Sequence, residues 1–216
     1  MVLPGELIPL AEDTGLINPM RDWVLRTACQ QAKGWAKAGL RIPISVDIFP
    51  RHIKHEDLHE VIAAVLLETG LDPRLLRIEL TESTLMENTD STIKPLYRLY
   101  SKGVEISLDD FGTGYSSLTY LRRFPISTLK IDESFTREIT TDPGDAAICS
   151  GVIALAHSLG LKVVFEGVET SEQLEFLRRK DCDEVQGRAI CAPLPAEGCG
   201  QFMRENSFKT RLEKIS

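Results

Sequence analysis

The 216-residue sequence lacks several features that would assign it to large classes of protein. No apolar run reaches the roughly 18 residues that span a bilayer, and the first residues do not follow the basic-then-apolar order of a signal peptide. A net charge of −7 disfavours non-specific binding to the nucleic-acid backbone. These absences predict a cytoplasmic protein that has no membrane segment and binds neither DNA nor RNA.

Cysteines spaced for metal binding are also missing. The five cysteines are odd in number and include no CxxC pair, which favours reduced thiols over a disulfide framework or a zinc site. The composition is 43% apolar and 26% charged, as in ordinary globular proteins, and the length suffices for one well-filled core. We therefore expect a single domain over residues 1–216.

Short apolar strands alternate with helices along most of the chain. The expected strands are Ile42–Phe49, Leu75–Leu80, Val104–Asp109, Ser127–Ile131, Lys162–Phe165 and Asp183–Val185. The expected helices are Pro4–Gly15, Asn18–Gly39, Glu56–Thr69, Ser91–Lys102, Leu118–Phe124, Asp145–Leu159, Ser171–Lys180 and one after Pro195. The second helix carries Trp23, Val24, Ala28, Ala32 and Ala36 on one side, which we expect to be its packed face. This alternation predicts a mostly parallel sheet wrapped by helices.

Every expected strand has a polar residue at or near its carboxyl end. These residues are Asp47, Glu79, Asp109 with Asp110, Lys130, Glu166 and Gln186. In a doubly wound sheet only the strand ends beside the switch point would line a site, whereas in a barrel all carboxyl ends surround one mouth. We therefore predict an α/β fold of the TIM-like (β/α)8 barrel type, with six of the eight strands present.

The two adjacent carboxylates of Asp109 and Asp110 precede a loop that contains Gly112 and Gly114. Neighbouring residues of a strand point to opposite faces, but both acids can reach one pocket where the chain bends, provided that a cation lies between them. This interpretation predicts a metal site. The alternative is a strand-to-helix turn with solvated aspartates, because acidic residues are common at turns.

A mouth with Asp47, Glu79, Asp109, Asp110 and Glu166 would offer only carboxylates as ligands, which suits Mg²⁺ or Mn²⁺. A shared Asp beside a second Asp suits two ions about 3.5–4 Å apart, an arrangement used in phosphoryl chemistry. Lys130 would hold the nucleophilic water or a phosphoryl oxygen, and Glu166 could accept a proton. The simpler alternatives are a salt bridge for Lys130 and a strand-end hydrogen bond for Gln186.

Six motifs resemble the EAL domain of cyclic di-GMP phosphodiesterases, in order, from about Pro4 to Pro195. They are Leu7-Ile-Pro-Leu-Ala-Glu-Asp-Thr-Gly-Leu-Ile, Glu79-Leu-Thr-Glu-Ser, Asp109-Asp-Phe-Gly-Thr-Gly-Tyr-Ser-Ser-Leu, Leu129-Lys-Ile-Asp, Glu166-Gly-Val-Glu-Thr and Gln186-Gly. The resemblance implies a TIM-like barrel with one antiparallel strand. It also implies hydrolysis of cyclic di-GMP to linear pGpG with Mg²⁺ or Mn²⁺.

The resemblance further implies a role for each matching residue. Asp47, Glu79 and Asp109 correspond to metal ligands, and Asp110 helps to hold the second ion. Lys130 and Glu166 serve the attacking water, and Gln186 lines the site. Glu82 and Glu169 brace the Asp110–Ser117 loop, which in this family contributes to dimer contacts, so a homodimer is expected. An upstream sensory or GGDEF-type domain is a further expected partner.

Three departures from the family pattern leave the function open. The printed chain has no Glu-Ala-Leu strand, whose Glu is a metal ligand in the family; Asp47 stands where Asn is usual; and Arg188 stands where an aromatic residue is usual. We expect an amino-terminally incomplete phosphodiesterase of impaired activity, or alternatively an inactive domain that binds cyclic di-GMP or a protein. Schiff-base chemistry at Lys130 is disfavoured, because five surrounding acids would raise its pKa.

Overall fold

Six parallel strands form one sheet in the order β1-β2-β3-β4-β5-β6 in this computed structural model, which describes residues 4–48, 58–87, 89–113 and 121–206. The strands are β1 (Ile44–Asp47), β2 (Leu76–Thr81), β3 (Glu105–Phe111), β4 (Thr128–Ile131), β5 (Lys162–Phe165) and β6 (Glu184–Val185). All five neighbouring pairs are parallel. The predicted α/β class and the incomplete TIM-like barrel are confirmed. The antiparallel strand that the resemblance implied is not among the described strands.

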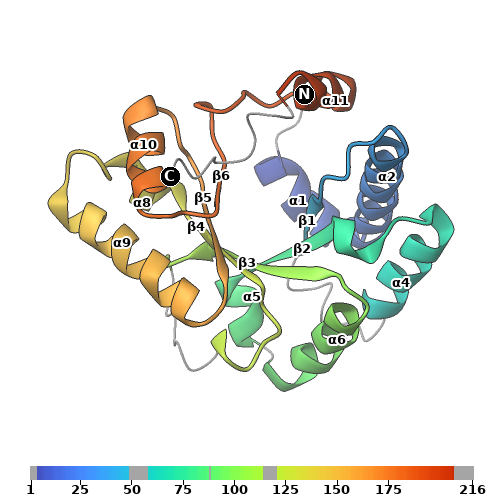
Figure 1. Ribbon diagram of the computed structural model, residues 1–216. Helices are drawn as coiled ribbons and strands as arrows, with labels where there is room; N and C mark the ends of the chain where they lie inside the picture. The colour runs from blue at the N-terminus through green and yellow to red at the C-terminus, as the bar shows by residue number, and fades with distance from the viewer. Residues whose placement is uncertain (1–3, 49–57, 88, 114–120, 207–216) are drawn as a thin grey trace.

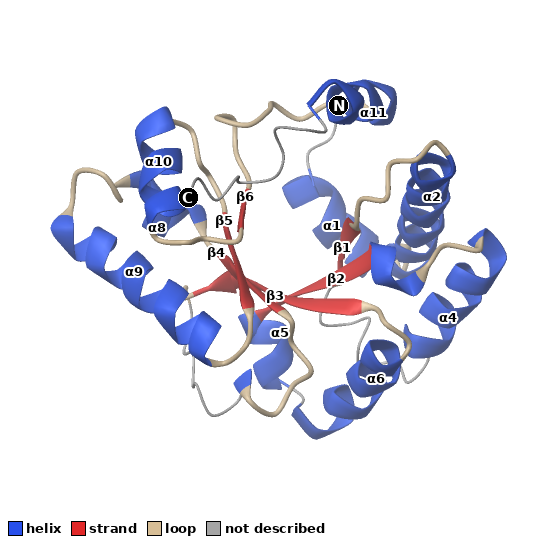
Figure 2. Ribbon diagram, viewed as in Figure 1, coloured by secondary structure: helices blue, strands red, loops and turns tan. Residues whose placement is uncertain are grey.

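Helices surround the outside of this curled sheet (Figures 1 and 2). They are α1 (Pro4–Asp13), α2 (Ile17–Lys37), α4 (Leu58–Thr69), α5 (Glu82–Glu87), α6 (Thr89–Ser101), α8 (Glu133–Arg137), α9 (Pro143–Ser158), α10 (Ser171–Arg179) and α11 (Ala196–Asn206), with a short 3₁₀ turn at Pro73–Leu75. Several begin at a side chain that caps the free backbone N–H groups. Asp142 accepts bonds from residues 144 and 145, and Thr170 and Gln173 form a capping box.

The two faces of the sheet differ in polarity because successive strand residues point to opposite sides. The convex face is apolar and packs against the helices; Ile78, Ile106 and Leu129 on it are almost completely buried. The concave face carries Glu79 on β2 and Lys130 on β4, which are also buried. The core therefore lies between sheet and helices, and the inner face of the curl is left for polar side chains.

Three sequence expectations for the helices need correction or fall outside the described residues. The short helices α5 and α8 follow directly after β2 and β4 and were not expected, because five or six residues carry too little periodicity to be recognised. The predicted packed face of α2 is confirmed for Ala28, Ala32 and Ala36, which are buried or packed against the core. It is wrong for Trp23 and Val24, which are 65% and 38% exposed. Of the expected helix at 118–124, residues 118–120 lie outside the described residues, and of the remainder only Leu121 is helical.

Within the described residues, every helix is too short or too polar to cross a bilayer.

Candidate metal centre

An irregularity in β3 brings the two adjacent aspartates to the same site. Leu108 pairs with Leu129 and Phe111 pairs with Ile131, so that Asp109 and Asp110 together lie opposite the single residue Lys130. Such a bulge interrupts the alternation of side chains and bends the strand. Asp110 adopts a positive φ of 54°, which is uncommon for a residue with a side chain. The bulge therefore allows neighbouring carboxylates to share one pocket.

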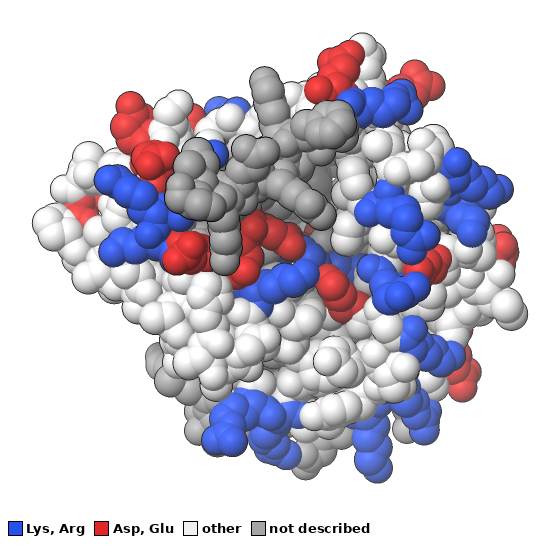
Figure 3. Space-filling view, in the orientation of Figure 1, with Lys and Arg blue, Asp and Glu red and all other residues white. Residues whose placement is uncertain are grey.

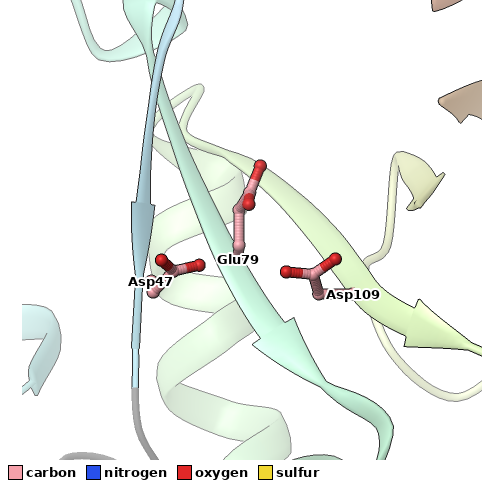
Figure 4. A group of neighbouring side chains, drawn as sticks. All are labelled: Asp47, Glu79 and Asp109. Carbon is pink, nitrogen blue, oxygen red and sulfur yellow. The ribbon is translucent and has the colours of Figure 1, made fainter. Parts of the chain in front are cut away.

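Two groups of carboxylates meet at the carboxyl ends of the strands. Asp47, Glu79 and Asp109 come from β1, β2 and β3, and each offers an oxygen within 4.8 Å of the others. Figure 4 shows the three side chains on neighbouring strands, with Glu79 between the other two. Asp109, Asp110 and Glu166 form a second group with the same spacing. Asp109 belongs to both groups, as expected for two adjacent ion positions with one shared ligand.

Lys130 lies at the junction of the two groups. Its Nζ atom donates a hydrogen bond to Oε2 of Glu79 at 2.6 Å and lies 3.0 Å from Oδ1 of Asp109 and 2.9 Å from Oε1 of Glu166. Figure 3 shows acidic and basic side chains side by side in the middle of the face that it displays. The ammonium group thus joins two strand residues, Glu79 and Asp109, and Glu166, which directly follows β5, into one cluster.

Burial and mutual repulsion shift the pKa values of several acids in the cluster. Loss of contact with water raises the pKa of Asp47, although it is the most exposed member, and repulsion from Glu79 raises it further. Burial likewise raises the pKa of Glu166, and the hydrogen bond from Lys130 offsets part of this effect. Burial alone would lower the pKa of Lys130, but its bonds to Glu79 and Glu166 outweigh that effect and raise it. Lys130 therefore stays charged and is unsuited to Schiff-base chemistry.

The residues present fit a pair of hard divalent cations. Five carboxylates face one ammonium group in this cluster, so four negative charges remain uncompensated. All the donor atoms are carboxylate oxygens, the ligand type that Mg²⁺ and Mn²⁺ prefer. The carboxylates lie close enough for one ion to contact several of them.

The other predicted site residues lie at the rim or below it. Gln186 is exposed, and its backbone N–H donates to the carbonyl oxygen of Phe165 at the end of β5. Glu82 is buried at the start of α5. Glu169 is exposed and lies 3.5 Å from the guanidinium of Arg188. Residues 114–117 of the loop that Glu82 and Glu169 were expected to brace lie outside the described residues, so this role stays a prediction.

Sequence reasoning missed Arg77, which lies on the same face of β2 as Glu79. Arg77 is buried and forms ion pairs with Glu105 and Glu184. A signal was available, because Arg77 and Glu79 are two residues apart and therefore share a face of the strand. Arg77 was missed because it lies near the start of β2, and only residues at the carboxyl ends of strands were considered.

Comparison with known proteins identifies similar sequences across almost the whole chain. A profile described as the EAL domain matches residues 1–193. The bifunctional diguanylate cyclase/cyclic di-GMP phosphodiesterase MucR of Pseudomonas aeruginosa is 46% identical over 198 residues, which cover 91% of this chain and 29% of MucR. The signaling protein YkoW of Bacillus subtilis is 43% identical over 94% of this chain and 25% of its own length. The chain therefore spans only about a quarter to a third of these relatives.

Solved structures agree with the sequence matches. The PaMucR phosphodiesterase in complex with c-di-GMP superposes with a TM-score of 0.87 at 45% identity, covering 92% of this chain and 81% of that one. A manganese/cy-diGMP complex of Klebsiella pneumoniae BlrP1 gives a TM-score of 0.74 at 29% identity, covering 81% of this chain and 44% of that one.

Proposed function

The chain belongs to the EAL domain family. We propose that it binds cyclic di-GMP through two divalent cations and takes part in the hydrolysis of cyclic di-GMP to pGpG. The observation that carries this proposal is the pair of carboxylate groups that share Asp109 and surround Lys130. Cations at these positions would draw the phosphodiester into an otherwise repulsive acidic site. The relatives named as cyclic di-GMP phosphodiesterases and the structure with bound c-di-GMP support the choice of substrate.

The proposed division of labour follows from the contacts in the cluster. Glu79, Asp109 and Asp47 would ligate one Mg²⁺ or Mn²⁺ ion, and Asp109 with Asp110 would ligate the second. When bound, the ions supply Lewis acidity that neutralises the phosphate and lowers the pKa of a water molecule. Lys130, held by three carboxylates, orients that water or a phosphoryl oxygen.

Glu166 and Gln186, which directly follow β5 and β6, complete the proposed site. Because its pKa is raised by burial, Glu166 is a better proton acceptor than an ordinary exposed carboxylate. Gln186 follows β6 and is exposed, so its amide is free to contact the ligand at the rim. Glu82 and Glu169 remain proposed supports of the loop after Asp110.

A second candidate function is binding without effective hydrolysis. It is favoured by a specific observation, since the printed chain contains no Glu-Ala-Leu strand to supply the further glutamate ligand that the family resemblance implies. Catalysis by two ions needs both held to within a fraction of an ångström, and a missing ligand loosens the first of them. Binding of the dinucleotide tolerates such looseness better than catalysis does.

We expect the 216-residue chain to bind cyclic di-GMP in the presence of Mn²⁺ but to produce pGpG very slowly or not at all. Calorimetry measures binding, and chromatography of the reaction mixture measures pGpG. The matched comparison is the same chain extended at its amino terminus by a strand that ends in Glu-Ala-Leu, which we expect to recover turnover. Rapid turnover by the 216 residues, abolished by Glu166→Gln, would instead mean that Asp47 replaces the missing ligand.

We also propose that the 216-residue chain self-associates. The described sheet ends in β1 on one side and β6 on the other, and an unpaired strand edge offers its backbone groups to another chain. We expect dimers or larger species by light scattering at tens of micromolar. The chain extended by the Glu-Ala-Leu strand is the control, because a strand that pairs with an open edge removes one route of association. A clean monomer for the shorter chain would contradict this expectation.

A further inference from the structure

Arg77 connects three strands on the concave face of the sheet, one layer below the carboxylate cluster. Its Nε and Nη2 atoms donate to Oε2 of Glu105 at 3.1 and 3.0 Å. Nη1 donates to Oε2 of Glu184 at 2.9 Å, and Nη2 also donates to Oε1 of Glu184 at 3.2 Å. The Arg77 side chain is only 8% exposed. A planar guanidinium with several fixed donors is suited to holding two carboxylates at defined positions.

The two contacts of Arg77 differ in what they connect. Glu105 lies directly opposite Arg77 on the neighbouring strand β3, where backbone hydrogen bonds already join the strands. Glu184 lies on β6, four strands away from β2 in the sheet order. In a flat sheet, four strand spacings of about 4.8 Å would separate the two by roughly 19 Å. The contact with Glu184 therefore exists only because the sheet curls, and it joins the two sides of the curl.

The strand β6, which carries Glu184, has few backbone contacts with its neighbour in the sheet. The strand β6 has two residues, and only two register pairs join it to β5, Val164 with Glu184 and Phe165 with Val185. Gln186 follows two residues after Glu184, just as Glu79 follows two residues after Arg77. The Arg77–Glu184 ion pair thus lies two residues before Glu79 on one side of the curl and two residues before Gln186 on the other.

We propose that Arg77 is a positioning residue that holds β6, through Glu184, at the distance from β2 that the bound dinucleotide requires. This inference rests on the proposed function, because it assigns Gln186 and the carboxylate cluster to opposite sides of one ligand site. Among the described residues, the hydrogen bonds and ion pairs of the Arg77 side chain go to Glu105 and Glu184 and not to the metal-site carboxylates. Its effect is on the width of the site and not on the chemistry.

Two single substitutions separate this positioning role from simple stabilisation. Glu184→Gln weakens the contact across the curl, whereas Glu105→Gln weakens the contact between neighbouring strands. Each substitution removes the negative charge of one carboxylate that pairs with Arg77. Calorimetry of cyclic di-GMP binding in saturating Mn²⁺ is the first readout. We expect about a tenfold loss of affinity for Glu184→Gln and less than a twofold change for Glu105→Gln. Arg77→Lys keeps the charge but not the bidentate geometry, and we expect it to resemble Glu184→Gln.

Hydrogen exchange gives a second readout that does not depend on ligand. Without metal or dinucleotide, we expect the amides of residues 184–189 to exchange at least fivefold faster in Glu184→Gln than in Glu105→Gln. Equal exchange and equal affinity in these two variants would overturn the positioning role. If the wild-type chain binds no cyclic di-GMP, the proposed function fails, while the exchange comparison still decides whether Arg77 holds β6 through Glu184.

Discussion

Asp109→Asn is expected to weaken both Mn²⁺ binding events, by about tenfold each or about 1.4 kcal/mol per ion. The reason is geometric, because Asp109 is the one residue shared by the two carboxylate groups found among the described residues. The Asn side chain is nearly the same size as that of Asp, but its amide group carries no formal charge. The same substitution also removes the negative charge that lies 3.0 Å from Nζ of Lys130. Calorimetric titration with Mn²⁺ measures both binding events.

The matched controls for Asp109→Asn are Asp47→Asn and Asp110→Asn. Each of these residues belongs to only one of the two groups, so each variant should weaken one binding event and leave the other nearly unchanged. Each of the three variants removes one negative charge from the same cluster. If only the total charge mattered, all three would lose Mn²⁺ affinity to the same extent. Equal losses in all three, or an unchanged affinity in Asp109→Asn, would contradict the assignment of Asp109 as the shared ligand.

Lys130→Met is expected to destabilise the metal-free protein by about 3 kcal/mol near pH 8. Lys130 and Glu79 are both buried, and the substitution leaves buried carboxylates without their cation. The variant should also lose hydrolysis in any chain that shows turnover, because no group remains to orient the water. Urea unfolding in the presence of a chelator measures the change in the free energy of unfolding.

The pH dependence of the Lys130→Met defect tests its electrostatic origin. The folded-state pKa values of Asp47 and Glu166 are already raised above their ordinary values of 3.8 and 4.5. A carboxyl group with a raised folded-state pKa contributes stability that is fully present below its unfolded pKa and is lost as the pH rises through the folded pKa. Removing Lys130 raises these pKa values further, so the defect should shrink from pH 8 to pH 5.

Two further measurements complete the Lys130 test. Saturating Mn²⁺ should restore part of the lost stability near pH 8, because the ion replaces the missing positive charge. Lys94→Met, which changes an exposed lysine on α6, is the control and should alter the free energy of unfolding by less than about 0.5 kcal/mol. A defect of the same size at both pH values would point to lost packing instead of unpaired charge.

The amino-acid sequence by itself determined which strands exist and which polar residues end them. Alternating strands and helices indicate a parallel sheet, and in such a sheet the carboxyl ends meet at one edge. Asp47, Glu79 and Glu166 could therefore be assigned to one site without coordinates, although they are far apart in the chain. The covalent order of residues suffices for this step because strand direction follows directly from the alternation.

Only the tertiary structure decided how these residues face one another. The bulge that sets Asp109 and Asp110 opposite Lys130 depends on the register between β3 and β4, which a strand pattern does not specify. The exposure of Trp23 depends on the neighbours of α2 and not on its periodicity. The pairing of Arg77 with Glu184 joins residues 107 positions apart and depends on the curvature of the whole sheet. Register, helix orientation and curvature arise from contacts between distant segments, and for this reason they cannot be read from any local stretch of sequence.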